Sequence, residues 1–203
     1  NVLVNSRSAR PELADTVEQA NQSGAASQGR AMACVADITL AADAARVVQS
    51  ALDQFGRIDI LINNASSFFP TAVGEITEKA WDDLVGTNLK APLFLSQAAA
   101  AELRKRHGCI VNIIDIHAEF PMKNYVVYTV AKAGLLALTR SLARELGPDV
   151  RVNGVAPGTI LWPDDDSWSD ELSRQRIVNR RPPRRRQIPA PAHRRPRPRS
   201  AHG

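Results

Sequence analysis

The sequence predicts an α/β protein in which a doubly wound parallel β-sheet is covered by helices. Short apolar runs alternate along the chain with longer segments of helical periodicity, which is the order of elements that a parallel sheet with crossover helices requires. The short runs are apolar throughout, as expected for strands that are buried on both faces. Polar residues follow the end of each run, where parallel sheets bind their ligands.

Five apolar runs predict the strands, namely 1–5, 31–39, 58–66, 108–115 and 150–158. Helical periodicity predicts helices over 10–23, 40–55, 77–106 and 125–146. Gly56 ends the second of these helices, and Gly147 with Pro148 ends the last. The 77–106 segment contains either one long helix or two helical segments that meet near Gly86.

The composition divides the chain into a domain at 1–173 and a tail at 174–203. Of the 26 basic residues, the tail holds 11, all arginine, together with six prolines and no acidic residue. The domain therefore carries 15 basic and 21 acidic residues, a net charge of −6. Such a tail cannot build a packed helix or strand. It is either an arm for nucleic acid or a membrane surface, or a non-native tail from a shifted reading frame. We favour the second interpretation, because the change is abrupt.

The remaining composition predicts a cytoplasmic protein. There is no run of 18 apolar residues, so we expect no membrane-spanning segment. Cys34 and Cys109 both lie in apolar stretches and are expected to be buried, reduced thiols. We expect no metal centre and no nucleic-acid partner.

Tyr128 and Lys132 stand four residues apart, which places them on one face of the last helix. A nearby ammonium favours the phenolate, so Lys132 is expected to lower the pKa of Tyr128 and make it a usable proton donor. Asp115, at the end of the preceding strand, adds a carboxylate. The alternatives for Asp115 are a helix N-cap or an ion pair with Lys123.

Four motifs identify a resemblance. They are "NNAS" at 63–66, Asn88 within "GTNLKAP", the Tyr128/Lys132 pair and "VNGVAPG" at 152–158. Over residues 1 to about 172 the chain resembles the short-chain dehydrogenase/reductase family, which implies a Rossmann-like fold. Two residues differ from the usual family pattern: Asp115 replaces a serine, and Ser66 replaces a glycine. Both differences resemble the pteridine reductases, a subgroup that reduces pterins and folates with NADPH.

The resemblance implies how the catalytic and substrate-binding residues act. Tyr128, linked to Asp115, gives or relays the proton to a C=N bond of dihydropterin or dihydrofolate. Lys132 also holds the nicotinamide ribose, and Asn88 helps to hold a water beside this lysine. Phe68 stacks on the pterin ring. The alternative is that Phe68 and Phe69 are both ordinary core residues, and we favour that alternative for Phe69. Ser66 contacts the cofactor phosphate or the pterin, or is a turn serine.

A second set of residues is expected to bind NADPH. Arg7, flanked by Ser6 and Ser8, suits a 2′-phosphate because no acidic residue precedes Glu12. Its alternative is an exposed arginine at a strand end. Asp37 resembles the family's contact to the adenine amino group, or is a helix cap. The resemblance completes the cofactor set as Arg7, Ser8, Asp37, Asn63, Ala65, Ser66, Tyr128, Lys132, Pro157 and Gly158.

The resemblance also implies parts that the sequence does not contain. No Gly-rich turn precedes Arg7, so we expect the sheet to lack its central strand, and the family's last strand is replaced by the tail. The intact family implies a homotetramer packed through the Tyr128 helix and the 77–106 segment. Two rival functions stay open: a short-chain carbonyl or alcohol reductase, and a catalytically dead fragment whose basic tail binds a polyanion.

Overall fold

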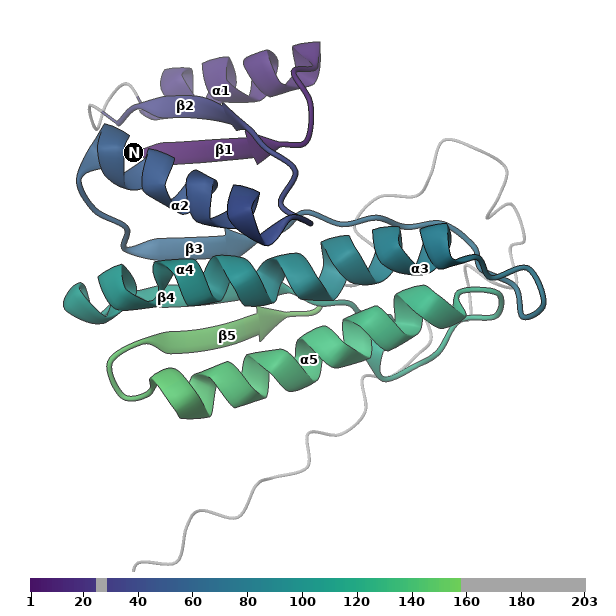
Figure 1. Cartoon of the computed structure of the whole chain (residues 1–203). Helices are drawn as coiled ribbons and strands as arrows, with labels where there is room; N and C mark the ends of the chain where they lie inside the picture. Colours follow the sequence, from purple (N-terminus) through teal and green to yellow (C-terminus); the bar gives the residue numbers. More distant parts are fainter. Residues whose placement is uncertain (25–28, 158–203) are drawn as a thin grey trace, which may run out of the picture. The chain divides into compact units, whose positions relative to one another are not determined.

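The computed structural model describes residues 1–24 and 29–157 (Figure 1), so the predicted tail lies outside the described residues. The strands are β1 (Val2–Ser6), β2 (Ala31–Val35), β3 (Ile60–Asn63), β4 (Cys109–Ile113) and β5 (Arg151–Val155). The helices are α1 (Pro11–Gly24), α2 (Ala41–Phe55), α3 (Glu78–Val85), α4 (Ala91–Lys105) and α5 (Val126–Leu146). Every predicted strand and helix is confirmed, and the predicted α/β class is confirmed with them.

All the strand pairs are parallel, but the described strands form two sheets. β1 pairs with β2, and β3, β4 and β5 pair in that order. The strand arrows in Figure 1 point the same way, so the carboxyl ends lie at one edge. A cavity of about 800 Å³ separates β1 from β3 and is lined by residues of these two strands and of α2 and α4. This is where the resemblance implies a further strand.

The segment at 77–106 contains two helices and not one. α3 begins after Thr77, whose hydroxyl accepts from the Ala80 N–H at 3.2 Å. A five-residue π-helix (Gly86–Lys90) then joins α3 to α4. This wider turn places Asn88, a predicted site residue, on a buried face, and π-helical turns occur frequently at functional sites.

The core packs α2 and α4 against the three-stranded sheet. Leu95, Ala99 and Leu103 of α4 meet Ile110 of β4 and Val48 of α2 in one buried cluster. Burying a side chain such as Leu or Ile stabilises the fold by about 1.5–3 kcal/mol. Val48, Leu95 and Ala99 of this cluster also line the cavity between β1 and β3.

α2 and α5 end where glycines predicted their ends. Gly56 has a left-handed φ of 70°, and its N–H donates to the Leu52 carbonyl at 2.7 Å. α5 is also long and apolar enough, by length and composition alone, to cross a membrane. In this structure it packs against β5 and carries the buried side chains of Tyr128 and Lys132, so it is a helix of the α/β domain.

Candidate active site

Asp115 and Tyr128 form the centre of the candidate site. Asp115 lies just after the end of β4, and Tyr128 lies in the first turn of α5. The Tyr128 hydroxyl donates to Asp115 Oδ2 at 2.6 Å. The other carboxylate oxygen, Oδ1, accepts from the His117 N–H at 2.8 Å and caps a short 3₁₀ turn at Ile116–Ala118. The Asp115 carboxylate therefore has both expected roles, as a helix N-cap and as the partner of Tyr128. Within residues 1–24 and 29–157 no ion pair joins Asp115 to Lys123.

The surroundings of Tyr128 raise its pKa above the ordinary value of 10.0, opposite to our expectation. Burial is the largest cause, since the side chain is only 4% exposed. The hydrogen bond to Asp115 and its negative charge raise the pKa further, whereas the hydroxyl of Ser66 acts in the opposite direction. The expectation was wrong because it counted only the ammonium of Lys132. Tyr128 is held as the neutral phenol, the form that can donate a proton.

Lys132 lies one turn further along α5 and is also buried. Its Nζ donates to the Ile113 carbonyl at 3.0 Å and lies 5.7 Å from the centroid of the Tyr128 ring. Burial lowers the pKa of Lys132, and the charge of Asp115 acts in the opposite direction. An ammonium has three N–H donors, so the bond to Ile113 leaves two for other partners.

Asn88 anchors the loop that follows β3. Its Nδ2 donates to the carbonyls of Ser67 and Leu84, both at 2.9 Å, and its Oδ1 accepts from the Ser66 hydroxyl at 2.7 Å. The structure thus brings Ser66 and Asn88 together. The expected role of Asn88 in holding a water stays a prediction.

Phe68 and Phe69 take different positions. Phe68 is 52% exposed, stacks on Tyr125 with centroids 4.7 Å apart and an interplanar angle of 16°, and meets Tyr128 edge-on at 4.8 Å. Phe69 packs against the buried cluster of Leu84 and Val127. Phe69 is therefore core, as its alternative predicted, and Phe68 lies at the mouth of the site.

Sequence reasoning missed Tyr125 and Thr71. Thr71 is buried, its hydroxyl accepts from the Val127 N–H at 3.2 Å, and its own N–H donates to the Asn124 carbonyl at 2.5 Å. These bonds tie the loop carrying Phe68 to the start of α5. Tyr125 could have been found, because it lies three residues before Tyr128 and so shares its helix face.

Arg7 occupies a site of mixed charge at the end of β1. Its guanidinium donates to Thr87 Oγ1 at 3.1 Å and forms ion pairs with Asp37 at 3.6 Å and Asp83 at 3.7 Å. Its side chain is still 52% exposed. Beside it, Ser8 Oγ accepts from Arg10 Nε at 3.1 Å. This pair of arginines with a serine fits a phosphate, although the two carboxylates compete for Arg7.

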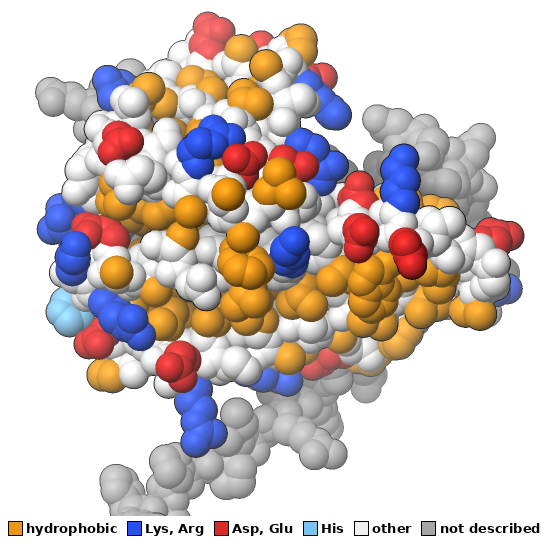
Figure 2. Space-filling view, in the orientation of Figure 1, with side chains coloured by type: hydrophobic (Ala, Val, Ile, Leu, Met, Phe, Trp, Pro, Cys, Tyr) orange, Lys and Arg blue, Asp and Glu red, His pale blue; other side chains and the backbone are white. Residues whose placement is uncertain are grey.

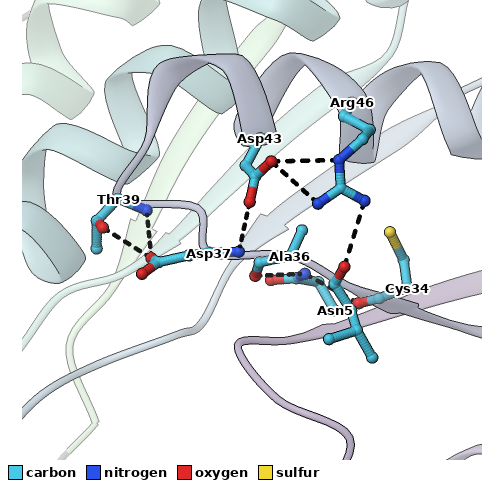
Figure 3. A network of polar contacts seen from close by, with 8 residues as sticks. Asn5, Cys34, Ala36, Asp37, Thr39, Asp43 and Arg46 are labelled. Atoms are coloured by element: carbon cyan, nitrogen blue, oxygen red, sulfur yellow. Dashed lines mark hydrogen bonds and ion pairs between the residues drawn. The ribbon is translucent and has the colours of Figure 1, made fainter.

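Asp37 caps the turn that follows β2 (Figure 3). Its Oδ1 accepts from the hydroxyl of Thr39 at 2.7 Å and from the Thr39 N–H at 3.0 Å. These bonds lower the pKa of Asp37, with a smaller contribution from Arg7. Asp43, from α2, accepts from the Asp37 N–H at 2.9 Å and pairs with Arg46. Asp37 is not a helix cap, because Leu40 is the N-cap residue of α2 and no described side chain accepts from the first turn of that helix. The contact of Asp37 to adenine stays a prediction.

Two of the remaining predicted cofactor residues, Asn63 and Ala65, line the cavity. Asn63 is buried and donates from Nδ2 to Asn112 Oδ1 at 2.8 Å, but its Oδ1 has no hydrogen-bond partner among the described residues. A buried acceptor left open at a strand end fits a ligand that brings a donor. Ala65 lines the cavity beside it. Pro157 follows β5, and Gly158 lies outside the described residues.

A phenol, an ammonium and a carboxylate at the carboxyl edge of a parallel sheet define a proton-transferring oxidoreductase site. The chain is matched over residues 4–192 by the family described as "Enoyl-(Acyl carrier protein) reductase". It is 33% identical over 180 residues to the 3-oxoacyl-[acyl-carrier-protein] reductase FabG of Staphylococcus aureus, covering 88% of this chain and 72% of that protein. The chain belongs to the short-chain dehydrogenase/reductase family, whose members use a nicotinamide cofactor.

Two other relatives extend this comparison. Pteridine reductase 1 of Leishmania tarentolae is 39% identical over 163 residues, which are 70% of this chain and 56% of that protein. The crystal structure of a putative short-chain alcohol dehydrogenase from Sinorhizobium meliloti 1021 superposes with a TM-score of 0.76 at 31% identity, covering 86% of this chain and 68% of that one. These similarities support the family and its fold, and they name different substrates.

Proposed function

We propose that this chain is an NADPH-dependent reductase of C=N bonds in dihydropterin or dihydrofolate substrates. The observation that carries the proposal is the 2.6 Å hydrogen bond from Tyr128 to Asp115. A ketone reductase needs a second donor beside the tyrosine, because a carbonyl oxygen only accepts. An ionised carboxylate can accept hydrogen bonds but cannot donate them. Asp115 therefore suits a substrate ring that presents N–H groups. The 39% identity to pteridine reductase 1 agrees with this assignment.

The proposed proton transfer uses the neutral Tyr128. A nicotinamide cofactor held by Lys132 would supply the hydride for the ring carbon of the C=N bond. The π electrons of that bond move to the ring nitrogen, the O–H bond of Tyr128 breaks, and an N–H bond forms. Tyr128 then regains a proton from solvent. Asp115 holds the phenol in place before the transfer, and Lys132 offers its remaining N–H donors to the nicotinamide ribose.

The proposed preference for NADPH rests on Arg7 and its neighbours. Arg7 is half exposed at a strand end, and the Ser8 hydroxyl and Arg10 lie next to it. A charge-assisted contact to a 2′-phosphate favours NADPH, whereas Asp37 and Asp83 reduce the positive field that the phosphate would meet.

The second candidate is a short-chain carbonyl or alcohol reductase. It is favoured by the FabG relative, which aligns over more of both chains than pteridine reductase 1 does. In that case Asp115 serves only as the cap of the 3₁₀ turn. For either substrate class, we also propose that the protein is cytoplasmic and forms a homotetramer.

Two variants of Asp115 test the proposal by NADPH oxidation with dihydrobiopterin and with an acetoacetyl thioester. Asp115→Asn keeps the shape and an oxygen for the His117 N–H, but it removes the charge. Asp115→Ser introduces a hydroxyl that can donate to a carbonyl. We expect pterin turnover to fall about 10²-fold in both variants, the scale of a lost acid–base partner, while thioester reduction in Asp115→Ser is retained or rises.

The opposite pattern would support the second candidate. Thioester reduction by the unchanged chain without any pterin turnover assigns a carbonyl reductase. Strong pterin reduction that survives both substitutions shows that Asp115 is a structural cap, and the proposed role of the carboxylate is then wrong.

A further inference from the structure

The guanidinium of Arg7 makes one hydrogen bond among the described residues, and its partner is Thr87. Arg7 Nη2 donates to Thr87 Oγ1 at 3.1 Å. The other two nitrogens lie 3.6 Å from Asp37 and 3.7 Å from Asp83, and both distances are longer than a hydrogen bond. A guanidinium has five N–H donors. Most of these donors therefore stay open to a ligand.

Three segments that are distant in sequence meet at Arg7. Arg7 itself follows β1, and Asp37 follows β2 at the same edge of that sheet. Thr87 comes from the π-helix between α3 and α4. The π-helix approaches the turn after β2 closely, since a Cβ placed on Gly86 would lie 3.4 Å from the side chain of Thr39. This close approach brings the Thr87 hydroxyl within reach of the guanidinium.

The Thr87 oxygen is held in place as an acceptor. The residue is only 6% exposed, and its branched side chain is stiff at χ1. The same oxygen accepts from the Ser67 hydroxyl at 3.3 Å. A hydroxyl oxygen has two lone pairs to offer as acceptors, and Arg7 and Ser67 take both of them. Thr87 thus restrains one nitrogen of Arg7 from a buried, fixed position.

The charge of each partner of Arg7 separates Thr87 from the two carboxylates. Asp37 and Asp83 attract the guanidinium, but their negative charges also repel a phosphate. The hydroxyl of Thr87 carries no charge, so it restrains Arg7 and leaves the positive charge intact. Ordering a free arginine on binding costs conformational entropy. A guanidinium that is already restrained loses less entropy when a ligand binds.

We propose that Thr87 is a positioning residue that sets the preference for a 2′-phosphate by holding the guanidinium of Arg7 in place. This role rests on the proposed function in one respect, the assignment of Arg7 to the 2′-phosphate of NADPH. Thr87 itself does not touch the phosphate. It acts through Arg7, so its effect disappears when Arg7 is absent.

A pair of nucleotides that differ only in the 2′-phosphate tests this role in the full chain. Isothermal titration calorimetry measures the affinities for adenosine 2′,5′-bisphosphate and for adenosine 5′-monophosphate, and circular dichroism checks the fold. Thr87→Val keeps the shape of the side chain but removes the acceptor. We expect it to lower the ratio of the two affinities by about 3- to 10-fold, the scale of one hydrogen bond. The affinity for the monophosphate should not change.

Further variants separate positioning from general damage to the π-helix. Thr87→Ala, which leaves more room beside Arg7, should lower the ratio as Thr87→Val does, and Thr87→Ser should restore it. Ser67→Ala is the matched control, because it removes the other donor to Thr87 and should leave the ratio unchanged. Asp83→Asn should raise the ratio by about 2- to 5-fold, since it removes a charge that repels the phosphate.

A double variant shows whether Thr87 acts through Arg7. Arg7→Ala combined with Thr87→Val should give the same ratio as Arg7→Ala alone, because the two side chains act as one unit. Additive losses would mean that Thr87 affects the nucleotide by another route, and the inference would be wrong. It is also wrong if the ratio stays unchanged in both Thr87→Val and Thr87→Ala, or if Asp83→Asn lowers the ratio as Thr87→Val does.

The result is distinct from that of the substrate test. A chain that loses its 2′-phosphate preference in Thr87→Val but reduces no pterin retains the inference and loses the proposed substrate. A chain that reduces pterins while the ratio stays unmoved by Thr87→Val and Thr87→Ala does the reverse. An unchanged chain that binds both nucleotides equally, or binds neither, overturns the role of Thr87 together with the assignment of Arg7.

Discussion

The Tyr128 hydroxyl lies 2.6 Å from Asp115 Oδ2, and this contact joins the first turn of α5 to the end of β4. It holds the proton on Tyr128 in two ways, since the carboxylate accepts that proton and its charge opposes a phenolate. The same carboxyl group caps the 3₁₀ turn through its other oxygen. One residue therefore caps the local backbone and, together with burial, keeps the donor protonated.

The raised pKa of Tyr128 predicts a loss of stability at alkaline pH. The folded chain keeps this proton above pH 10.0, where the unfolded chain releases it. Each pH unit in that window then costs about 1.4 kcal/mol of the free energy of unfolding. The difference in this free energy between the parent and Tyr128→Phe should be constant below pH 10 and should shrink above it. Urea titrations at several pH values measure it, with Tyr125→Phe as the control.

The burial of Lys132 changes the free energy of unfolding at lower pH than Tyr128 does. It therefore does not mask the loss of stability that Tyr128 causes at alkaline pH. Its pKa is lowered in the folded chain, so its contribution to stability rises as the pH approaches 10.5 and then stays level. A difference between parent and Tyr128→Phe that is independent of pH above 10 would contradict the prediction for Tyr128.

Arg7 should decide the choice between NADPH and NADH. We expect the unchanged chain to bind NADPH about 10- to 100-fold more tightly than NADH, the value of a charge-assisted contact. Arg7→Ala should remove most of this difference and leave NADH binding nearly unchanged. Isothermal titration calorimetry measures both affinities. Arg140→Ala, which removes an exposed arginine 3.9 Å from Glu119, is the control. Equal affinities in the unchanged chain would show that Arg7 does not bind a 2′-phosphate.

Phe68 and Phe69 should separate ligand binding from stability. Phe68→Ala removes an exposed ring from the mouth of the site, so we expect binding of a flat heteroaromatic ligand such as dihydrobiopterin to weaken about 3- to 10-fold. The thermal midpoint should change little. Phe69→Ala should lower the free energy of unfolding by about 3 kcal/mol or more, because it leaves a cavity beside Leu84 and Val127. Fluorescence titration and thermal unfolding measure the two effects, and a reversal between the variants would contradict the assignment.

Asn112 should be the most sensitive polar residue of the core. It is fully buried, accepts from Asn63 at 2.8 Å and donates to Thr139 Oγ1 at 2.9 Å, which ties β3 and β4 to α5. Asn112→Ala leaves the Asn63 amide without its acceptor, so we expect a loss of about 2–4 kcal/mol in the free energy of unfolding. Gln49→Ala, which removes an exposed bond to Asp53, should change it by less than about 0.5 kcal/mol. Similar losses in both variants would rule out the buried network as the cause.

The outer faces of α4 and α5 should mediate self-association. Figure 2 shows a band of hydrophobic side chains over these helices. Leu93 of α4 and Val126 and Val130 of α5 are exposed apolar residues. We expect Val130→Lys to reduce the mass measured by sedimentation velocity, because a charge in an apolar interface is costly. Ile62→Lys tests a second exposed apolar surface, at the edge of β3 that pairs with no other described strand. If only Ile62→Lys dissociates the chain, association occurs through the strand edge.

The sequence alone determined the elements and the chemistry that they carry. Apolar runs and helical periodicity predicted all five strands and the helices between them, because burial of both sheet faces leaves a pattern in consecutive residues. The i, i+4 spacing of Tyr128 and Lys132 and the strand-end position of Asp115 predicted one site, since helix faces and strand ends follow from local geometry. The helix end at Gly56 was equally local.

Only the tertiary structure decided how those groups influence one another. The direction of the Tyr128 pKa shift depends on burial and on the 2.6 Å distance to Asp115, and neither can be read from spacing. The contact of Ser66 with Asn88 joins residues 22 positions apart. The ion pairs of Arg7 and the division into two sheets likewise arise from segments distant in sequence. Side-chain environments are non-local sums over packed neighbours, so they exist only once the fold has formed.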